Sequence, residues 1–467
     1  MDQSILDFCE KVIEKWLQKG ASYVECRTEE RKTFSVKIVD GVIKSLGSGI
    51  VSGVGVRILY KGFMFFKSYS LTEASPEKIV FFEPVEKPWM EKVSLVSIKP
   101  TIDEVIVEQK KKFEDVSTEE KVSLLLKENR GIIEDPIKTA ETVYEELTVD
   151  KWIITSEGTK VHMKIPYVYL SHRATARENG RINESRARLG GIGGLELMSA
   201  EKLEKVSQRA KARAVEGVRA KRVKPGAYRV LLDGEINHLF AHEAVGHASE
   251  ADSAKTGSLL RKKLGKRIAS PIVDLIDDGR FEINGIKGFG WIPYDDEGVP
   301  TEKTYIIKEG VLVSYMTDRA TASYFNLKPT GNARAQDFTF PPIVRMRNTY
   351  IAASEPEKAL SNEELLEALG NGLLLKGGRG GQVEPLTGTF TFGVQEVYLV
   401  EKSEIKERLA STSISGNFLE VLNKIRAVGK EFDEPEASVG FCGKGGQSVP
   451  VGVSGVWLLV EKLHVGG

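Results

Sequence analysis

The stretch AHEAVGHASEAD, residues 241–252, places two imidazoles and a carboxylate within six positions, at His242, Glu243 and His247. The whole chain of 467 residues contains only six histidines, so this clustering is a strong signal. Neutral imidazoles are common zinc ligands, and a carboxylate beside them can take a proton from metal-bound water. The stretch therefore indicates a zinc hydrolase, with a metallopeptidase as the first hypothesis. The competing interpretation is two ordinary helix histidines.

The spacing of the histidines predicts an irregular helix. Residues four apart lie within roughly 40° of each other around a regular α-helix, whereas residues five apart lie about 140° apart. A regular helix could not hold one metal ion with both His242 and His247. A π-bulge adds one residue to a turn and would bring the two side chains together, and so would a helix that kinks or ends at Gly246.

A third metal ligand is needed, because a catalytic zinc site usually has three protein ligands and one open position for water. The candidates are His238, Glu250, Asp252 and Cys442. Cys442 lies among glycines in GFCGKGG, residues 440–446, and these glycines would let the backbone bring a thiolate close to a metal. The residues alone favour Cys442 over the acids only weakly.

Composition excludes several classes of partner. Lys plus Arg and Asp plus Glu both number 66, so no net charge favours nucleic acid or an anionic membrane. The first 20 residues predict an amphipathic helix and neither a signal peptide nor a membrane span, which makes a cytoplasmic location the default. Three cysteines give no disulfide framework, and we expect Cys9 and Cys26 to be core thiols.

The pattern of the first half predicts a mixture of helices and antiparallel strands. Turns at Asp40–Gly41 and Lys61–Gly62 favour hairpins. We expect the following elements: an antiparallel meander over 22–70, a helix after the SerThrGluGlu capping box at 117–120, a second helix over 136–147, strands over 150–197 and a helix over 199–219.

The predicted fold class is α+β, with two domains. Residues 1–220 form an N-terminal α+β domain with an antiparallel sheet, and residues 221–467 form a mostly antiparallel β catalytic domain that carries the metal-site helix. Nucleotide binding is not expected. The glycine runs at 377–381 and 190–194 lack the spacing of a dinucleotide fingerprint, and Lys444 is not followed by the Ser or Thr of a phosphate-binding loop.

Longer motifs, in a fixed order along nearly the whole chain, resemble the TldD/PmbA family, in particular its metal-bearing TldD-type subunits. They are GVGVRILYKG (53–62), HEAVGHASEAD (242–252), DDGR (277–280), DDEGVPT (295–301), GNARA (331–335), RMRNTY (345–350) and CGKGGQSVPVG (442–452).

The resemblance implies a zinc peptidase that acts on short or unfolded polypeptides. Zinc would be held by His242, His247 and Cys442, with Glu243 as the general base. It also implies a dimer, either with an identical chain or with a PmbA-type subunit, and a sequestered active site.

Two other functions remain open on the residues. One is a non-enzymatic regulatory or binding subunit with a structural metal, and the other is a zinc hydrolase of a non-peptide substrate. For the peptidase, the segments 377–393 and 440–456 are candidate walls of a groove that binds an extended peptide by backbone pairing, or else tight β-turns. Glu250 and Asp252 are candidate acceptors for the free N–H groups of the ligand histidines, or ordinary surface acids.

Overall fold

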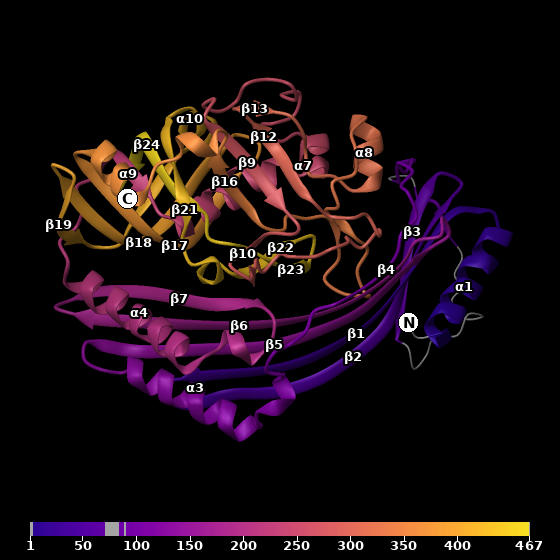
Figure 1. The fold of residues 1–467 in the computed structure, drawn as a ribbon, viewed down its shortest axis with the longest axis horizontal. Coiled ribbons are helices and arrows are strands. Elements are labelled where there is room, and N and C mark those ends of the chain that lie inside the picture. Colours follow the sequence, from indigo (N-terminus) through magenta and orange to yellow (C-terminus); the bar gives the residue numbers. More distant parts are fainter. Residues whose placement is uncertain (1–2, 71–83, 88–89, 467) are drawn as a thin grey trace.

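The computed structural model describes residues 3–70, 84–87 and 90–466, and its two β-rich halves pack face to face (Figure 1). A long, curved sheet forms the first half, and the second half lies on the concave face of that sheet. The α+β fold class predicted from the sequence is confirmed. None of the described helices is long and apolar enough to cross a membrane.

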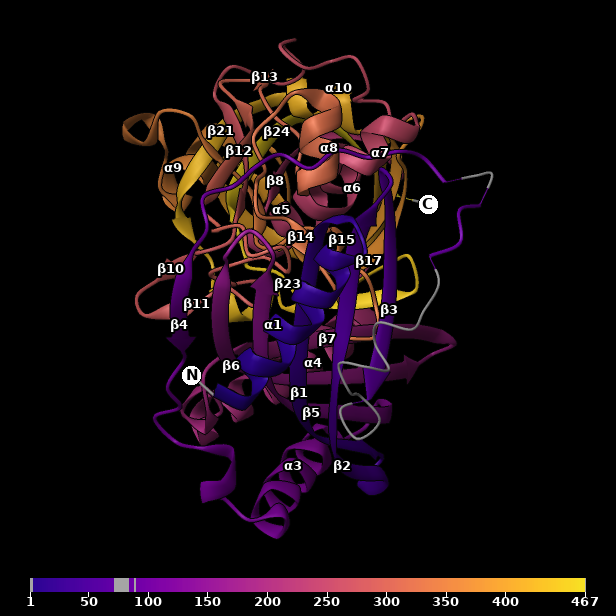
Figure 2. The same ribbon diagram turned by 90° about the vertical axis from the view of Figure 1, so that its right-hand side faces the viewer.

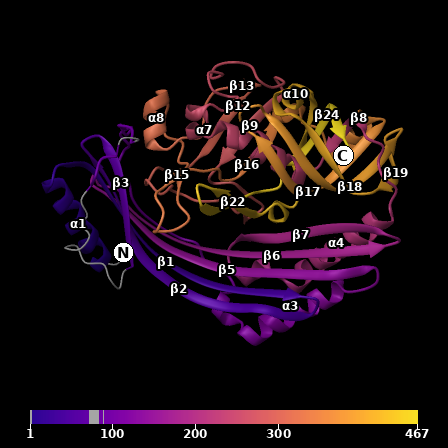
Figure 3. The same cartoon turned by 180° about the vertical axis from the view of Figure 1, so that it is seen from behind.

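The first sheet has seven strands, in the order β3-β2-β1-β5-β6-β4, with β7 paired to another part of β6. All neighbours are antiparallel except β4 and β6. The strands are β1 Ala21–Val39, β2 Val42–Tyr60, β3 Phe63–Ser70, β4 Ile102–Ile106, β5 Ile137–Thr155, β6 Lys160–Glu178 and β7 Arg181–Ile192. Several of these strands run almost the full length of the molecule beneath the second half (Figure 3).

Two-residue turns set the register of the meander. Asp40 and Gly41 both have positive φ, at 51° and 74°, and so do Lys61 and Gly62, at 52° and 86°. Such turns match the right-handed twist of the flanking strands. The hairpins predicted over 22–70 are therefore confirmed.

Residues 136–147 are a strand, and the predicted helix there is wrong. The segment belongs to β5, which lies between β1 and β6 and pairs with both along most of its length. Its burial alternates with a period of two from Ala140 to Glu146. The β-branched residues Thr142 and Val143 suit such a pleated surface, and pairing on both sides overrides the weak helical periodicity.

Helices cover the sheet on its outer face and at one end. Figure 2 shows α1, Gln3–Gln18, lying against the strands, where its apolar face and β1 bury Cys9 and Cys26 completely. α3, Thr118–Ile132, begins at the predicted capping box of Ser117 and Glu120. α4, Ala200–Arg219, packs beside it on the convex face. The predicted helices at these places and the predicted core thiols are confirmed.

The second half contains a ring of strands. Its seven-stranded sheet has the order β17-β8-β24-β20-β18-β19, with β21 on β24, and the additional pairing of β17 with β18 closes the ring. Only β17 and β8 are parallel. The strands are β8 Gly226–Leu232, β17 Gly372–Glu384, β18 Thr389–Glu401, β19 Glu404–Leu409, β20 Thr412–Asn417, β21 Ile425–Phe432 and β24 Val456–Val465.

Shorter elements complete this half. The strands are β9 Val273–Asp278, β10 Glu282–Ile283, β11 Ile286–Lys287, β12 Lys303–Lys308, β13 Val311–Leu312, β14 Ala333–Arg334, β15 Ile343–Val344, β16 Thr349–Ala353, β22 Gly440–Lys444 and β23 Gln447–Val451. The α-helices are α5 Gly234–Leu239, α6 His247–Ser249, α7 Ala251–Thr256, α8 Arg319–Phe325, α9 Asn362–Leu369 and α10 Phe418–Asn423.

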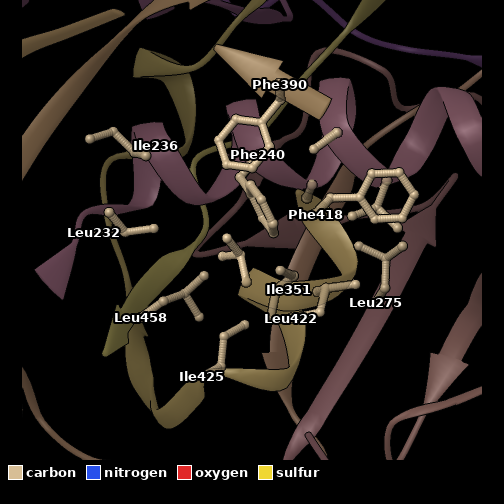
Figure 4. Packing of buried hydrophobic residues seen from close by; sticks show 14 of the residues in the cluster. Leu232, Ile236, Phe240, Leu275, Ile351, Phe390, Phe418, Leu422, Ile425 and Leu458 are labelled. Atoms are coloured by element: carbon tan, nitrogen blue, oxygen red, sulfur yellow. The ribbon is translucent and has the colours of Figure 1, made fainter. Parts of the chain in front are cut away.

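The helical segment 234–256 runs through the core of the second half. Phe240 is 1% exposed and packs edge-on against Phe390 of β18, with ring centroids 5.4 Å apart (Figure 4). Ile236 and Ala244 are fully buried in the same cluster. Because apolar residues surround this segment, its backbone is fixed on several sides, which positions the polar side chains that it carries.

A buried ion network joins the two halves. Lys151 Nζ of β5 lies 2.7 Å from Asp296 Oδ1, and Arg57 Nη2 of β2 lies 2.7 Å from Glu297 Oε1. Burial alone would raise the pKa of Asp296, but the charges of Lys151 and Arg27 lower it to about 2. Asp296 is therefore ionised, and removing one partner alone would leave an uncompensated charge in the dry interface.

A glycine at the contact between the two halves allows them to approach closely. A Cβ atom on Gly53 would lie 2.0 Å from the ring of Phe338, which reaches across from the second half. Only glycine permits this approach.

Candidate metal centre

A π-helical turn brings the two histidines of the motif together. Residues Phe240–Gly246 form this turn, and the backbone N–H of His247 donates to the carbonyl oxygen of His242, five residues earlier. The extra residue in the turn compensates for the five-residue spacing. The imidazole rings of His242 and His247 lie 5.1 Å apart between centroids. Of the irregular helices predicted from the sequence, the π-bulge is the one that forms.

Gly246 allows this turn to pack. A Cβ atom at this position would lie 2.2 Å from Sδ of the buried Met346 and 3.0 Å from the carbonyl oxygen of Ala241. The close approach leaves no space for a side chain at the point where the π-turn meets its neighbour.

Cys442 completes the group from a distant segment. It lies on β22, the first strand of the hairpin formed with β23, and its Sγ atom is 3.7 Å from Nε2 of His247. One ligand atom from each of His242, His247 and Cys442 lies within 4.8 Å of the other two. The thiol is 6% exposed, and the carbonyl oxygen of Cys442 accepts a hydrogen bond from Arg345.

The charges in this group suit a metal cation. Burial would raise the pKa of the Cys442 thiol, but its interactions with His242 and His247 lower it to about 4. The sulfur is thus a thiolate, the form that binds metal. In the described part of the chain, the buried Nδ1 atom of His242 has no hydrogen-bond partner. Two imidazoles, one of them with this unsatisfied nitrogen, and a thiolate are a donor set that fits zinc.

Glu243 lies beside the group and is not part of it. Its Oε2 atom is 3.8 Å from Nε2 of His247, and its side chain is 31% exposed. The carboxylate faces a cavity of about 240 Å³ that is also lined by the two histidines and Cys442. It is therefore within reach of a molecule that occupies the cavity.

Glu250 holds one histidine in place. Its Oε2 atom accepts a hydrogen bond from Nδ1 of His247 at 3.0 Å and lies 3.1 Å from Nζ of Lys444. Burial would raise the pKa of Glu250, but His247 and Lys444 lower it. Asp252 instead pairs with Lys444 at 2.7 Å. Of the two acids, only Glu250 contacts a histidine of the group.

His238 also lies outside the group. Its Nδ1 atom donates to the carbonyl oxygen of Thr349 at 3.2 Å, although its ring centroid is only 5.6 Å from that of His242. Of the four candidates for the third ligand, the structure brings Cys442 alone into the set of mutually close ligand atoms among the described residues.

Sequence reasoning missed Arg188 and the role of Lys444. Arg188 of β7 reaches the cavity from the first sheet, and no motif marks it. Lys444 is two residues after Cys442 on the same strand, so the two side chains share a face. This alternation along the strand could have predicted that Lys444 lies near the metal group. Gly378 and Gly380 of β17 and residues 438–443 line the cavity as well, and they lie in or beside the segments 377–393 and 440–456.

Comparison with known proteins relates all parts of the fold to one family. Models of the PmbA/TldA metallopeptidase family match residues 24–80 as domain 1, 111–218 as the central domain and 225–467 as the C-terminal domain. A metalloprotease of Methanocaldococcus jannaschii is 37% identical over 95% of this chain and 96% of its own length. A zinc metalloprotease TldD homolog of Saccharolobus solfataricus is 32% identical over 98% and 99%.

Solved structures share the fold. TldE from Thermococcus kodakarensis superimposes with a TM-score of 0.72 at 16% identity, over 98% of this chain and 99% of its own. A protein of Thermotoga maritima gives a TM-score of 0.76 at 22% identity, with the same coverage.

Proposed function

Because the chain belongs to the PmbA/TldD metallopeptidase family, we propose that it is a zinc-dependent peptidase that hydrolyses short or unfolded polypeptides. The observation that carries this proposal is the group of His242, His247 and Cys442 with Glu243 beside it, at one wall of a cavity. The relative from Saccharolobus solfataricus, which is named a zinc metalloprotease, supports the choice of metal.

In this proposal the two histidines and the thiolate of Cys442 hold the zinc ion. When bound, zinc supplies Lewis-acid chemistry, which polarises a carbonyl group and makes water more acidic. Glu243 takes the proton from the attacking water and returns it to the nitrogen of the leaving amine. Because a thiolate ligand adds negative charge, the metal is a weaker Lewis acid than it would be with three neutral ligands. Glu243 therefore carries more of the activation of water.

Glu250 positions His247 in this mechanism. By accepting a hydrogen bond from Nδ1–H of His247, it leaves Nε2 of the same ring, the atom that would bind the metal, facing Cys442. Lys444 neutralises part of the charge on Glu250. The pair therefore stabilises one tautomer and one ring orientation.

Substrate access supports a preference for unfolded chains. The cavity lies between the second half and the concave face of the first sheet, and Gly378, Gly380 and residues 440–443 give it walls of backbone. An extended peptide can pair with exposed backbone of this kind with little dependence on sequence. A folded protein could not present an extended segment in so small a space.

Two further features belong to the proposal. Residues 1–220 and 221–467 act as two domains that together enclose the cavity, to which the first contributes Arg188 and the second the metal ligands. The working form is a dimer, with an identical chain or with a PmbA-type subunit, because family resemblance favours one and because a dimer would shield the cavity from folded neighbours.

The test compares wild type with Glu243→Gln after both are loaded with zinc. We expect the variant to keep one zinc per chain and to lose activity toward a denatured peptide library by a factor of about 10² to 10⁴, the usual contribution of a general base. Glu363→Gln, an exposed residue of α9, is the control and keeps full activity.

Two other outcomes would contradict this proposal. Wild-type rates in Glu243→Gln would remove Glu243 from proton transfer. A zinc-loaded wild type that cleaves no peptide would favour a structural metal in a binding subunit, or a hydrolase of non-peptide substrates.

A further inference from the structure

Arg188 is placed on the cavity by the alternation of β7. Its neighbours Ala187 and Leu189 are buried against α4 on the convex side of the sheet. Since side chains alternate along a strand, Arg188 points to the concave side. There it lines the same cavity as His242, Glu243 and His247.

Among the residues that the structure describes, none is a counterion for the charge of Arg188. No described carboxylate lies within ion-pair distance of its guanidinium, and its Nε atom is buried without a hydrogen-bond partner. Glu235 lines the same cavity, but its carboxylate is 2.7 Å from the guanidinium of Arg213. Arg213 itself is paired twice, with Glu235 and with Glu396.

Positive charge also accumulates around this position. Arg186 projects from the same face of β7, and both burial and the charge of Arg188 lower its pKa. A partly buried guanidinium without a partner is unfavourable, and its planar N–H groups match a carboxylate in a bidentate arrangement. A ligand with an anionic group that binds in the cavity would therefore provide the counterion for Arg188.

We propose that Arg188 binds a carboxylate of the peptide substrate, so that the enzyme favours peptides with a negative charge close to the cleaved bond. This inference rests on the proposed peptidase function. The cavity of about 240 Å³ is smaller than the roughly 300–1,000 Å³ of typical ligand pockets. Because Arg188 lines the same cavity as Glu243 and Cys442, the bound carboxylate belongs to a residue close to that bond. The carboxylate comes either from the C-terminus of the peptide or from an Asp or Glu side chain.

The test uses three peptides of one sequence that is otherwise free of acidic residues. The first has a free C-terminus, the second is amidated, and the third is amidated and carries Glu beside the cleaved bond. Values of kcat/KM are measured for wild type, Arg188→Gln, Arg188→Lys and Arg186→Gln, all loaded with zinc. Arg186→Gln is the matched control, because it removes the same charge from the same face of the strand.

We expect wild type to prefer a carboxylate-bearing peptide over the amidated one by roughly 10- to 100-fold in kcat/KM. This is the range expected for hydrogen bonds to charged groups, and the difference should lie mainly in KM. Arg188→Gln loses this preference, Arg188→Lys keeps part of it, and Arg186→Gln, which removes only a neighbouring charge, keeps most of it. A preference for the first peptide identifies the terminal carboxylate, and a preference for the third identifies a side chain.

The same peptides are also titrated onto zinc-loaded Glu243→Gln, with and without Arg188→Gln. This binding measurement does not depend on turnover, so it separates failure of the carboxylate site from failure of the proposed peptidase function. Equal affinity for all three peptides would overturn the inference. It would also be overturned if Arg188→Gln lowered the affinity for all three peptides by the same factor. The latter result would mean that Arg188 acts on the backbone or on the fold.

Discussion

The two imidazoles beside Cys442 lower the pKa of its thiol to about 4, whereas burial raises the pKa of the Cys26 thiol. Cys9 and Cys26 lie fully buried in the core between α1 and the first sheet. We expect Cys442→Ala to lose zinc after dialysis against a mild chelator, whereas Cys26→Ala keeps one zinc per folded chain. Metal analysis of the purified variants checks this. Equal zinc content in both would remove Cys442 from the site.

His172 makes stability depend on pH. It is fully buried in β6, with Nδ1 2.9 Å from Oγ1 of Thr142, and burial lowers its pKa from 6.5 to about 4. Between these values the unfolded chain binds a proton that the folded protein does not. The contribution of His172 is thus complete above pH 6.5 and is lost as the pH falls to about 4.

The shift corresponds to about 3 kcal/mol of free energy of unfolding. We expect urea denaturation to show a loss between pH 7 and pH 4 that is larger in wild type than in His172→Gln by about this amount. Parallel pH profiles for the two proteins would show that His172 is not the titrating group.

The metal-site residues differ in how far the sequence reveals them. His242, Glu243 and His247 are adjacent in sequence, so spacing and chemistry predict their joint role. Cys442 follows from family resemblance and not from spacing. Arg188 could not be predicted, because a lone arginine in a strand has no special signature until the second half folds over its face of the sheet.

At the scale of elements, the π-turn is sensitive to the addition of a single methyl group. A methyl group at Gly246 would clash with the buried Met346. We expect Gly246→Ala to lower the free energy of unfolding by about 1–3 kcal/mol and to weaken zinc binding, because the turn that aligns the histidines must shift. Denaturation curves and zinc titrations measure both effects.

Gly131→Ala is the control for this substitution. Gly131 lies in α3, and a Cβ atom there would meet nothing within 4 Å, so the change is expected to be neutral or to stabilise by up to about 1 kcal/mol. Adding Met346→Ala to Gly246→Ala should cost less than the sum of the two single changes, since the methyl group then has space. Full zinc affinity in Gly246→Ala would show that the turn tolerates a side chain.

Among the elements, sequence signals predict the structure correctly where it depends on residues close together in the chain. The capping box of Ser117 and Glu120 and the turn at Asp40–Gly41 act locally, and both elements form as predicted. The segment 136–147 fails because its conformation depends on partners more than 100 positions before it in β1 as well as on β6. Propensity within the segment contains no information on those partners.

At the scale of the whole molecule, the cavity needs both halves, and we expect it to be protected further by dimer formation. Light scattering should give twice the chain mass, either for this chain alone or with a PmbA-type subunit. The active species should digest a flexible peptide but not a stably folded protein that carries the same segment in a strand. A fully active monomer, or equal digestion of both substrates, would contradict this expectation.

The distance along the chain between the members of the metal group has a consequence for synthesis. Cys442 follows His247 by 195 residues. At about 5–20 residues per second, the ribosome makes the histidines roughly 10–40 s before the thiol. During that interval the growing chain has the base and two imidazoles but not the third member of the proposed zinc site. A nascent copy of this peptidase would therefore be unable to attack its own unfinished, still unfolded segments or those of its neighbours on the same messenger.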